Sequence, residues 1–197
     1  MSAAVVERLA AITGTRNHLL TPSCTTALEL ACRLVRLAPG DEVILPSFNF
    51  PSAATAISLT GATPVFADVS PITRNITVDD FEAMLSPRTK AIIVLHYAGL
   101  SSPIQEIRAL ADREGVIVIE DAAHGLGIKT SYGLLGSVGH LTVYSFHSTK
   151  NFQCGEGGSL QINDESFWDR AEIMREKGTD RRQFFRGQVD KYTWCDI

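Results

Sequence analysis

The sequence Ser-Phe-His-Ser-Thr-Lys-Asn at residues 145–151 indicates the fold class, because it follows a β-like run at residues 141–144 and precedes a glycine-rich run at residues 155–158. Lys150 is therefore expected in a loop directly after a strand, a position that suits a fixed reactive group. A lysine alone is a weak signal, since most lysines are solvated surface charges. The interpretation depends on the residues around it.

A second predicted strand supplies a carboxylate for this lysine. Residues 116–119 are continuously apolar and lead into Glu120 and Asp121. A lysine amine that forms a Schiff base, together with a carboxylate at a strand end, is what pyridoxal 5'-phosphate (PLP) chemistry needs. Lys150 would form the internal aldimine and then move the substrate proton. Asp121 would pair with the pyridinium nitrogen, although a helix N-cap is the alternative role.

A loop at residues 21–27 predicts the place of the cofactor phosphate. It leads into a helix N-terminus, where unpaired backbone N–H groups and the helix dipole favour an anion. The hydroxyls of Ser23, Thr25 and Thr26 add donors, but serine and threonine before a helix are also ordinary caps. Ser145 is a second candidate phosphate donor, with a plain strand-end serine as the alternative.

Two ring side chains are further candidates. Phe50 follows a strand and can stack on the pyridine ring, whereas the neighbouring Phe48 is better explained as a core residue. His124 can hydrogen-bond the phenolic oxygen of the cofactor or be a structural histidine. The histidines show no HxH or HExxH spacing, and residues 133–139 do not match GxGxxG, so neither a metal nor a dinucleotide site is predicted.

Apolar runs and helical patterns alternate along the chain, which predicts an α/β domain with a mostly parallel sheet flanked by helices. Ligands in such folds bind at the carboxyl ends of the strands, where both Asp121 and Lys150 fall. One large domain is predicted over residues 1–197. The predicted strands cover residues 43–45, 63–69, 91–95, 116–119, 141–146 and 159–162, and the predicted helices cover residues 25–37, 50–60, 78–85, 103–114 and 165–177.

The composition narrows the function classes. With 45% hydrophobic and 20% charged residues the chain is ordinary for a globular protein, and a net charge of -4 gives no reason to expect nucleic acid. Four cysteines without a CxxC pair predict a reduced, cytoplasmic protein. No signal-peptide core or membrane span is expected. The arginines at 181, 182 and 186 indicate a solvated face or a site for a phosphorylated ligand.

Taken together, these stretches resemble the DegT/DnrJ/EryC1/StrS family of PLP-dependent nucleotide-sugar aminotransferases. The resemblance implies an aspartate-aminotransferase-like (fold type I) large domain and a homodimer with sites at the subunit interface. It also implies transfer of an amino group from L-glutamate to the C4 keto carbon of a dTDP-4-keto-6-deoxy sugar. The matching stretches are residues 21–29, 39–44, 46–50, 120–125, 145–151 and 155–158.

A further stretch, residues 175–194, is similar to the dTDP-4-amino-4,6-dideoxygalactose transaminases of enterobacterial common antigen synthesis. By this resemblance the product would serve lipopolysaccharide, common antigen or deoxyaminosugar synthesis. The implied site residues are Lys150 as the aldimine lysine, Asp121 as the pyridinium partner, Phe50 as the stacking ring, and Cys24, Thr25 and Ser145 as phosphate ligands.

The chain also departs from the family pattern in three ways. His124 stands where glutamine is common, and Cys195 stands where the most similar sequences have arginine. The chain is about half of a family member, without the N-terminal arm and the C-terminal domain, so a truncated product or a fragment is expected. Three alternatives stay open: a C3 sugar aminotransferase, a non-catalytic PLP-fold domain, and a PLP-dependent sugar dehydratase. Lys150 argues against the dehydratase, whose relatives carry histidine there.

Overall fold

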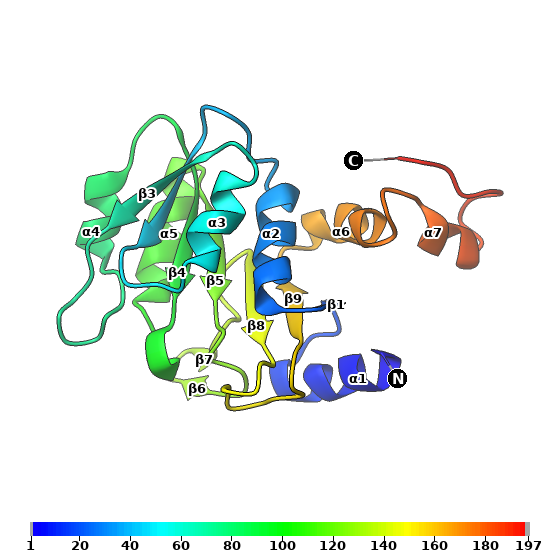
Figure 1. The fold of residues 1–197 in the computed structure, drawn as a ribbon, viewed down its shortest axis with the longest axis horizontal. Coiled ribbons are helices and arrows are strands. Elements are labelled where there is room, and N and C mark those ends of the chain that lie inside the picture. Colours follow the sequence, from blue (N-terminus) through cyan, green and yellow to red (C-terminus); the bar gives the residue numbers. More distant parts are fainter. Residues whose placement is uncertain (1, 196–197) are drawn as a thin grey trace. The chain divides into compact units, whose positions relative to one another are not determined.

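The computed structural model describes residues 2–195, which form two compact units that divide between Asn163 and Asp164. The first unit is built on one seven-stranded sheet with helices on both faces (Figure 1). The second unit is a short helical segment. This division does not decide whether the two units belong to one domain, so the single domain over residues 1–197 stays a prediction.

The central sheet has the order β1-β9-β8-β5-β4-β2-β3. The five strands from β8 to β3 run parallel, while β9 pairs antiparallel with both β8 and β1. The predicted mostly parallel sheet is therefore confirmed. The strands are β1 (His18–Thr21), β2 (Glu42–Pro46), β3 (Thr63–Ala67), β4 (Thr89–Leu95), β5 (Ile117–Asp121), β8 (Leu141–Ser145) and β9 (Gly158–Ile162), with a separate small hairpin of β6 (Lys129–Thr130) and β7 (Gly133–Leu134).

The helices of the first unit cover the two faces of this sheet (Figure 1). Two of them, α4 and α5, close one face over a buried cluster that includes Ile44, Phe81 and Val118. Helices α2 and α3 pack on the opposite face, toward which every second side chain of each strand points. The helices are α1 (Ser2–Thr13), α2 (Cys24–Leu34), α3 (Ser52–Ser58), α4 (Val78–Met84) and α5 (Ile104–Glu114), with a 3₁₀ turn η1 (Tyr97–Gly99).

Local sequence signals explain where several helices begin and end. Thr77 caps α4 and forms a full capping box with Asp80. Pro103 is the residue before α5 and not its first residue, which is a small correction. Gly115 ends α5 in the left-handed conformation that glycine adopts at no steric cost. Helix α1, strand β1, the β6–β7 hairpin and the η1 turn were not predicted. Strand β1 is a four-residue edge strand, which carries little pattern of its own.

A buried set of hydrogen bonds around Glu120 of β5 ties the end of β4 to the loop before β8. Nε2 of His96 lies 2.7 Å from Oε2 of Glu120, and both side chains are fully buried. Oε1 of Glu120 accepts hydrogen bonds from the backbone N–H groups of Val138 and Gly139. Since Nδ1 of His96 accepts from the N–H of Ser102, the ring hydrogen sits on Nε2 and is donated to Glu120.

The second unit consists of a 3₁₀ turn η2 (Glu165–Phe167), α6 (Trp168–Arg175) and α7 (Arg181–Phe185). The predicted helix over residues 165–177 is thus shorter and begins after a 3₁₀ turn, and α7 was not predicted. An isolated bridge between Thr179 and Trp194 closes the segment. None of the helices within residues 2–195 combines the length and apolar character of a membrane span.

The arginine cluster of this unit is engaged locally. Arg186 pairs with Glu172 at 2.7 Å, and Arg182 pairs with Glu176 at 3.0 Å. The guanidinium of Arg181 lies over the ring of Phe185, 5.2 Å from its centroid. These contacts favour the solvated face over the phosphate site, because each arginine already has a partner within its own unit.

The buried pair predicts a large stability effect. Replacing Glu120 with alanine leaves His96 Nε2–H and two backbone N–H groups without an acceptor, so we expect the free energy of unfolding to fall by about 3–5 kcal/mol. The matched control is Glu114→Ala on the exposed end of α5, which should change it by less than about 0.5 kcal/mol. Urea unfolding followed by circular dichroism measures both. Equal effects of the two substitutions would contradict this role of Glu120.

Candidate active site

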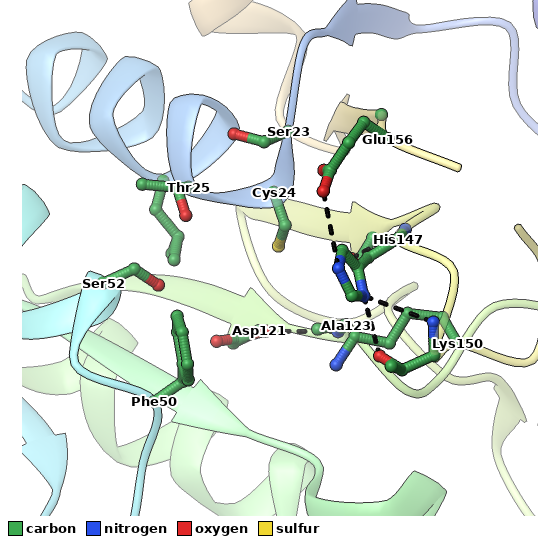
Figure 2. A pocket seen from close by; sticks show the side chains of 14 residues that line it. Ser23, Cys24, Thr25, Phe50, Ser52, Asp121, Ala123, His147, Lys150 and Glu156 are labelled. Atoms are coloured by element: carbon green, nitrogen blue, oxygen red, sulfur yellow. Dashed lines mark hydrogen bonds and ion pairs between the residues drawn. The ribbon is translucent and has the colours of Figure 1, made fainter. Parts of the chain in front are cut away.

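A cavity of about 240 Å³ opens at the carboxyl ends of β5 and β8, beside the N-terminus of α2 (Figure 2). Parallel strands place their carboxyl ends at one edge of a sheet, which is why residues far apart in sequence meet here. Six of the seven predicted site residues line this cavity: Cys24, Thr25, Phe50, Asp121, Ser145 and Lys150. The seventh, His124, lines an adjoining cavity of about 360 Å³ together with Phe50, Asp121 and Lys150.

The start of α2 presents unused hydrogen-bond donors to the cavity. Ser23 is the N-cap, and its Oγ accepts from the N–H of Thr26 at 3.1 Å. The N–H groups of Cys24 and Thr25 have no acceptor within residues 2–195. These donors and the positive end of the helix dipole form an anion site. Ser145, a buried residue at the end of β8, adds a hydroxyl on the other side.

A close backbone approach holds this helix start in place. A Cβ atom at Gly158 would lie 2.5 Å from the carbonyl carbon of Ser23 and 2.6 Å from the nitrogen of Cys24. No side chain fits between them, so β9 can pack directly against the first residues of α2 only because residue 158 is glycine. The glycine-rich run noticed in the sequence therefore has a structural purpose at one of its positions.

Asp121 is the last residue of β5 and is 5% exposed. Its Oδ1 accepts from the N–H of Ala123 at 3.1 Å, so the prediction of an N-cap is replaced by a bond across a tight turn. Burial raises the pKa of Asp121, while the Ala123 hydrogen bond acts in the opposite direction, as positive charges on His96 and Lys150 would. Such a carboxylate is stabilised by a cation placed in the cavity.

Lys150 lies in the turn after β8, with its Nζ 2.9 Å from Nε2 of His124. Nδ1 of His124 lies 3.3 Å from the backbone nitrogen of Ala98, which donates to it. Burial lowers the pKa of His124, and a charge on Lys150 would lower it further, so the ring is biased toward the neutral form. The structure thus places His124 between Lys150 and the η1 turn.

The two phenylalanines of the β2–α3 loop differ from expectation in one respect. Phe50 is 74% exposed, and no ring within residues 2–195 stacks on it, so its face is available at the mouth of both cavities. Phe48 was predicted as core, which is wrong. Its ring is half exposed and makes an edge contact with Tyr97 at 5.0 Å, and Arg74 lies 6.0 Å above it.

Sequence reasoning gave no site role to His147 and Glu156, which also line the cavity (Figure 2). Nε2 of His147 lies 3.4 Å from a carboxylate oxygen of Glu156, and its Nδ1 bonds Thr149. The signal for His147 was its place in the same seven-residue stretch as Lys150. The Cys24 sulfur points into the same space, and burial raises its pKa well above the usual range, so the thiol stays protonated.

These features fit PLP by their chemistry. Free N–H donors at α2 match a phosphate, a buried carboxylate matches a protonated ring nitrogen, and a lysine amine matches an aldehyde. The exposed face of Phe50 matches a flat heterocycle. The residues at this edge of the α/β sheet are therefore compatible in their chemistry with a phosphorylated aromatic aldehyde.

Comparison with known proteins agrees with this class. The profile of the DegT/DnrJ/EryC1/StrS aminotransferase family matches residues 3–192, and the chain belongs to this family. It is 39% identical over 180 residues to the spore coat polysaccharide biosynthesis protein SpsC of Bacillus subtilis (strain 168), covering 91% of this chain and 46% of that protein.

Solved structures give the same result. The aminotransferase TlmJ from Streptoalloteichus hindustanus superposes with a TM-score of 0.88 at 34% identity, covering 96% of this chain and 51% of TlmJ. DesI, solved in the presence of its TDP-sugar product, superposes with a TM-score of 0.82 at 34% identity, covering 88% of this chain and 44% of DesI. The predicted fold class is confirmed. The chain spans about half the length of these relatives.

The raised pKa of Asp121 predicts how stability depends on pH. A carboxyl whose pKa is higher in the folded state binds its proton more tightly there, so stability falls as the pH rises through and above the ordinary carboxyl range. Asp121→Asn removes the buried charge and keeps an oxygen for the Ala123 N–H. We expect the variant to be more stable than the wild type at pH 7 in the absence of PLP.

Urea unfolding at pH 7 and at a series of lower pH values checks this expectation. The difference should shrink as the pH falls, because Asp121 becomes protonated in both states. Glu114→Gln at the exposed end of α5 serves as the control for a surface carboxylate. A variant that is less stable than the wild type at pH 7 would show that Asp121 is already compensated within the protein.

Proposed function

We propose that the protein containing this chain is a PLP-dependent aminotransferase that moves an amino group from L-glutamate to the C4 keto carbon of a dTDP-4-keto-6-deoxyhexose. The product would be used for cell-surface polysaccharide or deoxyaminosugar synthesis in the cytoplasm. The observation that carries the proposal is the meeting of Lys150, Asp121 and the free N–H groups of α2 in one cavity.

Each residue has a separate task in this proposal. The N–H groups of Cys24 and Thr25, with the hydroxyl of Ser145, would bind the phosphate. Lys150 would hold the cofactor covalently and then take and return a proton at its Nζ. When bound, PLP withdraws electrons from the substrate carbon that bears the nitrogen. Asp121 would keep a proton on the ring nitrogen, and it can do so because its own charge is buried and short of partners.

Phe50 would orient the cofactor ring, and the second cavity would give a substrate access to it. The Phe50 ring would lie flat against the heterocycle and fix its plane. The cavity of about 360 Å³ shares Phe50, Asp121 and Lys150 with the first and offers space for a substrate beside the amine. Ala123, which also borders both cavities, leaves that space open because its side chain is a single methyl group.

The substrate is supported at a coarser level. The relatives include a polysaccharide biosynthesis protein and an enzyme solved with its TDP-sugar product. Residues 175–194 resemble C4 sugar transaminases, and this resemblance is the basis for C4 rather than C3. A homodimer with sites at the subunit interface, which the family resemblance implies, forms part of the proposal.

Cofactor binding is tested first with the 197-residue chain. Addition of PLP should produce a visible absorbance band, and borohydride should fix the cofactor on one peptide that contains Lys150. Lys150→Ala should abolish the fixed label, whereas Lys129→Ala at an exposed position should keep it. Peptide mass spectrometry locates the label. A folded chain that gives no label on Lys150 would count against the proposed cofactor site.

Substrate choice is tested with the PLP-loaded protein, L-glutamate and a keto sugar. We expect 2-oxoglutarate to appear with dTDP-4-keto-6-deoxyglucose at a rate at least about tenfold above that with a 3-keto isomer, and NMR of the product should place the amine on C4. Amination at C3 would replace the C4 assignment by the C3 alternative. Labelled Lys150 without turnover would favour the non-catalytic domain for this chain.

A further inference from the structure

Four nitrogen atoms from three residues lie in a chain at the edge of the site. The backbone N–H of Ala98 faces Nδ1 of His124 at 3.3 Å, and Nε2 of the same ring faces Nζ of Lys150 at 2.9 Å. The first atom of this chain belongs to the backbone, so its role is fixed. A backbone N–H can only donate, and therefore Nδ1 must offer its lone pair.

This bond decides where the ring hydrogen sits. A neutral imidazole carries one hydrogen, and an accepting Nδ1 leaves it on Nε2. Nε2–H then points at Nζ of Lys150, which has to accept. Only the neutral amine has a lone pair, because an ammonium has three donors and no acceptor. The opposite arrangement would turn an Nδ1–H toward the N–H of Ala98, so that two donors faced each other.

The donor at Ala98 is held by a built turn. Ala98 has φ 53° and ψ 22°, a left-handed conformation that a residue with a Cβ adopts only when its surroundings impose it. Asn75, which is 2% exposed, supplies those surroundings. Its Oδ1 accepts from the N–H of Tyr97 at 2.8 Å and its Nδ2 donates to the carbonyl of Leu100 at 2.9 Å.

We propose that His124 is a positioning residue that donates its Nε2–H to Lys150 and so holds the lysine as a neutral amine before any cofactor is present. This inference rests on the proposed function, because it takes Lys150 as the reactive lysine. The neutral amine is the nucleophilic form, so the contact prepares Lys150 to capture an aldehyde. A glutamine at this position would carry both a donor and an acceptor and would impose no such direction.

The other groups around Lys150 make no hydrogen bond that competes with this contact within residues 2–195. The Asp121 carboxylate favours an ammonium, but within residues 2–195 it makes no hydrogen bond to Nζ. Cys24 is a protonated thiol and adds no charge. His147 and Glu156 bond each other across the cavity. On the η1 side Tyr97 packs its ring edge-on against His124, with centroids 6.1 Å apart, and makes no bond to Nζ.

The first test reads the hydrogen on the wild-type ring directly. The 197-residue chain is labelled with ¹⁵N in its histidine rings, and NMR is recorded without PLP at pH 8, with His124→Gln identifying the His124 signals. We expect a protonated Nε2 and an unprotonated Nδ1. The opposite tautomer, or a doubly protonated ring, would overturn the proposal, and this test requires no mutant to be active.

The second test reads the reactivity of Lys150 without cofactor. Trace acetic anhydride labels lysines in their neutral form, and mass spectrometry compares Lys150 with Lys129, an exposed lysine in the same chain. In His124→Gln the Lys150 rate at pH 8 should fall about tenfold relative to Lys129, and its pH profile should move up by about one unit. Tyr97→Phe, which keeps the ring against His124, should leave the ratio unchanged.

An unchanged Lys150 ratio in a folded His124→Gln variant would overturn the proposal. Both tests use the cofactor-free chain, so they can succeed even if PLP uptake fails. In the reverse case, PLP fixed on Lys150 with no effect of His124 would keep the proposed function and remove this inference. Failure of the proposed function and failure of the inference about His124 therefore give different results.

Discussion

Two carboxylates stand side by side at the end of β5, and the pleat of that strand sends them to opposite faces of the sheet. Glu120 faces the α5 side, where His96 and two backbone N–H groups satisfy it completely. Asp121 faces the α2 side, where it has a single N–H donor. The end of β5 thus carries two different carboxylates. Glu120 has its hydrogen bonds complete within the fold, whereas Asp121 keeps hydrogen-bonding capacity that faces the candidate site.

The same contrast explains which parts of the site are stable alone. Burial raises the pKa of Asp121, and the Phe50 ring is largely exposed, so both lack a partner that a bound heterocycle would supply. In contrast, Ser23 and Gly158 are already engaged through the cap and the close packing of β9 on α2. Ligand binding would therefore complete interactions that the scaffold leaves open, and would not need to reorganise those that it has formed.

Much of the fold followed from the sequence, and the exceptions have physical causes. Continuous apolar runs predicted β4, β5 and β8 because a sheet covered on both faces needs them. The four residues of β1 carry no such run, since their pairing with β9 is decided by tertiary contact. Phe48 was placed in the core on its apolar character, but the structure uses that ring against Tyr97 at the cavity mouth. Ion pairs within its unit hold helix α7, and ion pairs leave no hydrophobic periodicity from which the helix could be predicted.

Candidate site residues could be predicted where one residue type suits one chemical task. They could not where the role of a side chain depends on a neighbour brought near by the fold. Lys150 and Asp121 could be selected as candidates because few side chains suit those tasks, and the structure brings both to one cavity. The tautomer of His124 could not, since it depends on an N–H of Ala98 that only the η1 turn aims. A substitution of glutamine by histidine reads as conservative in sequence, yet it exchanges a freely turning amide for a ring whose two nitrogens have fixed and opposite roles. The direction of the hydrogen bond between His124 and Lys150 is then set at Ala98, 26 residues before His124.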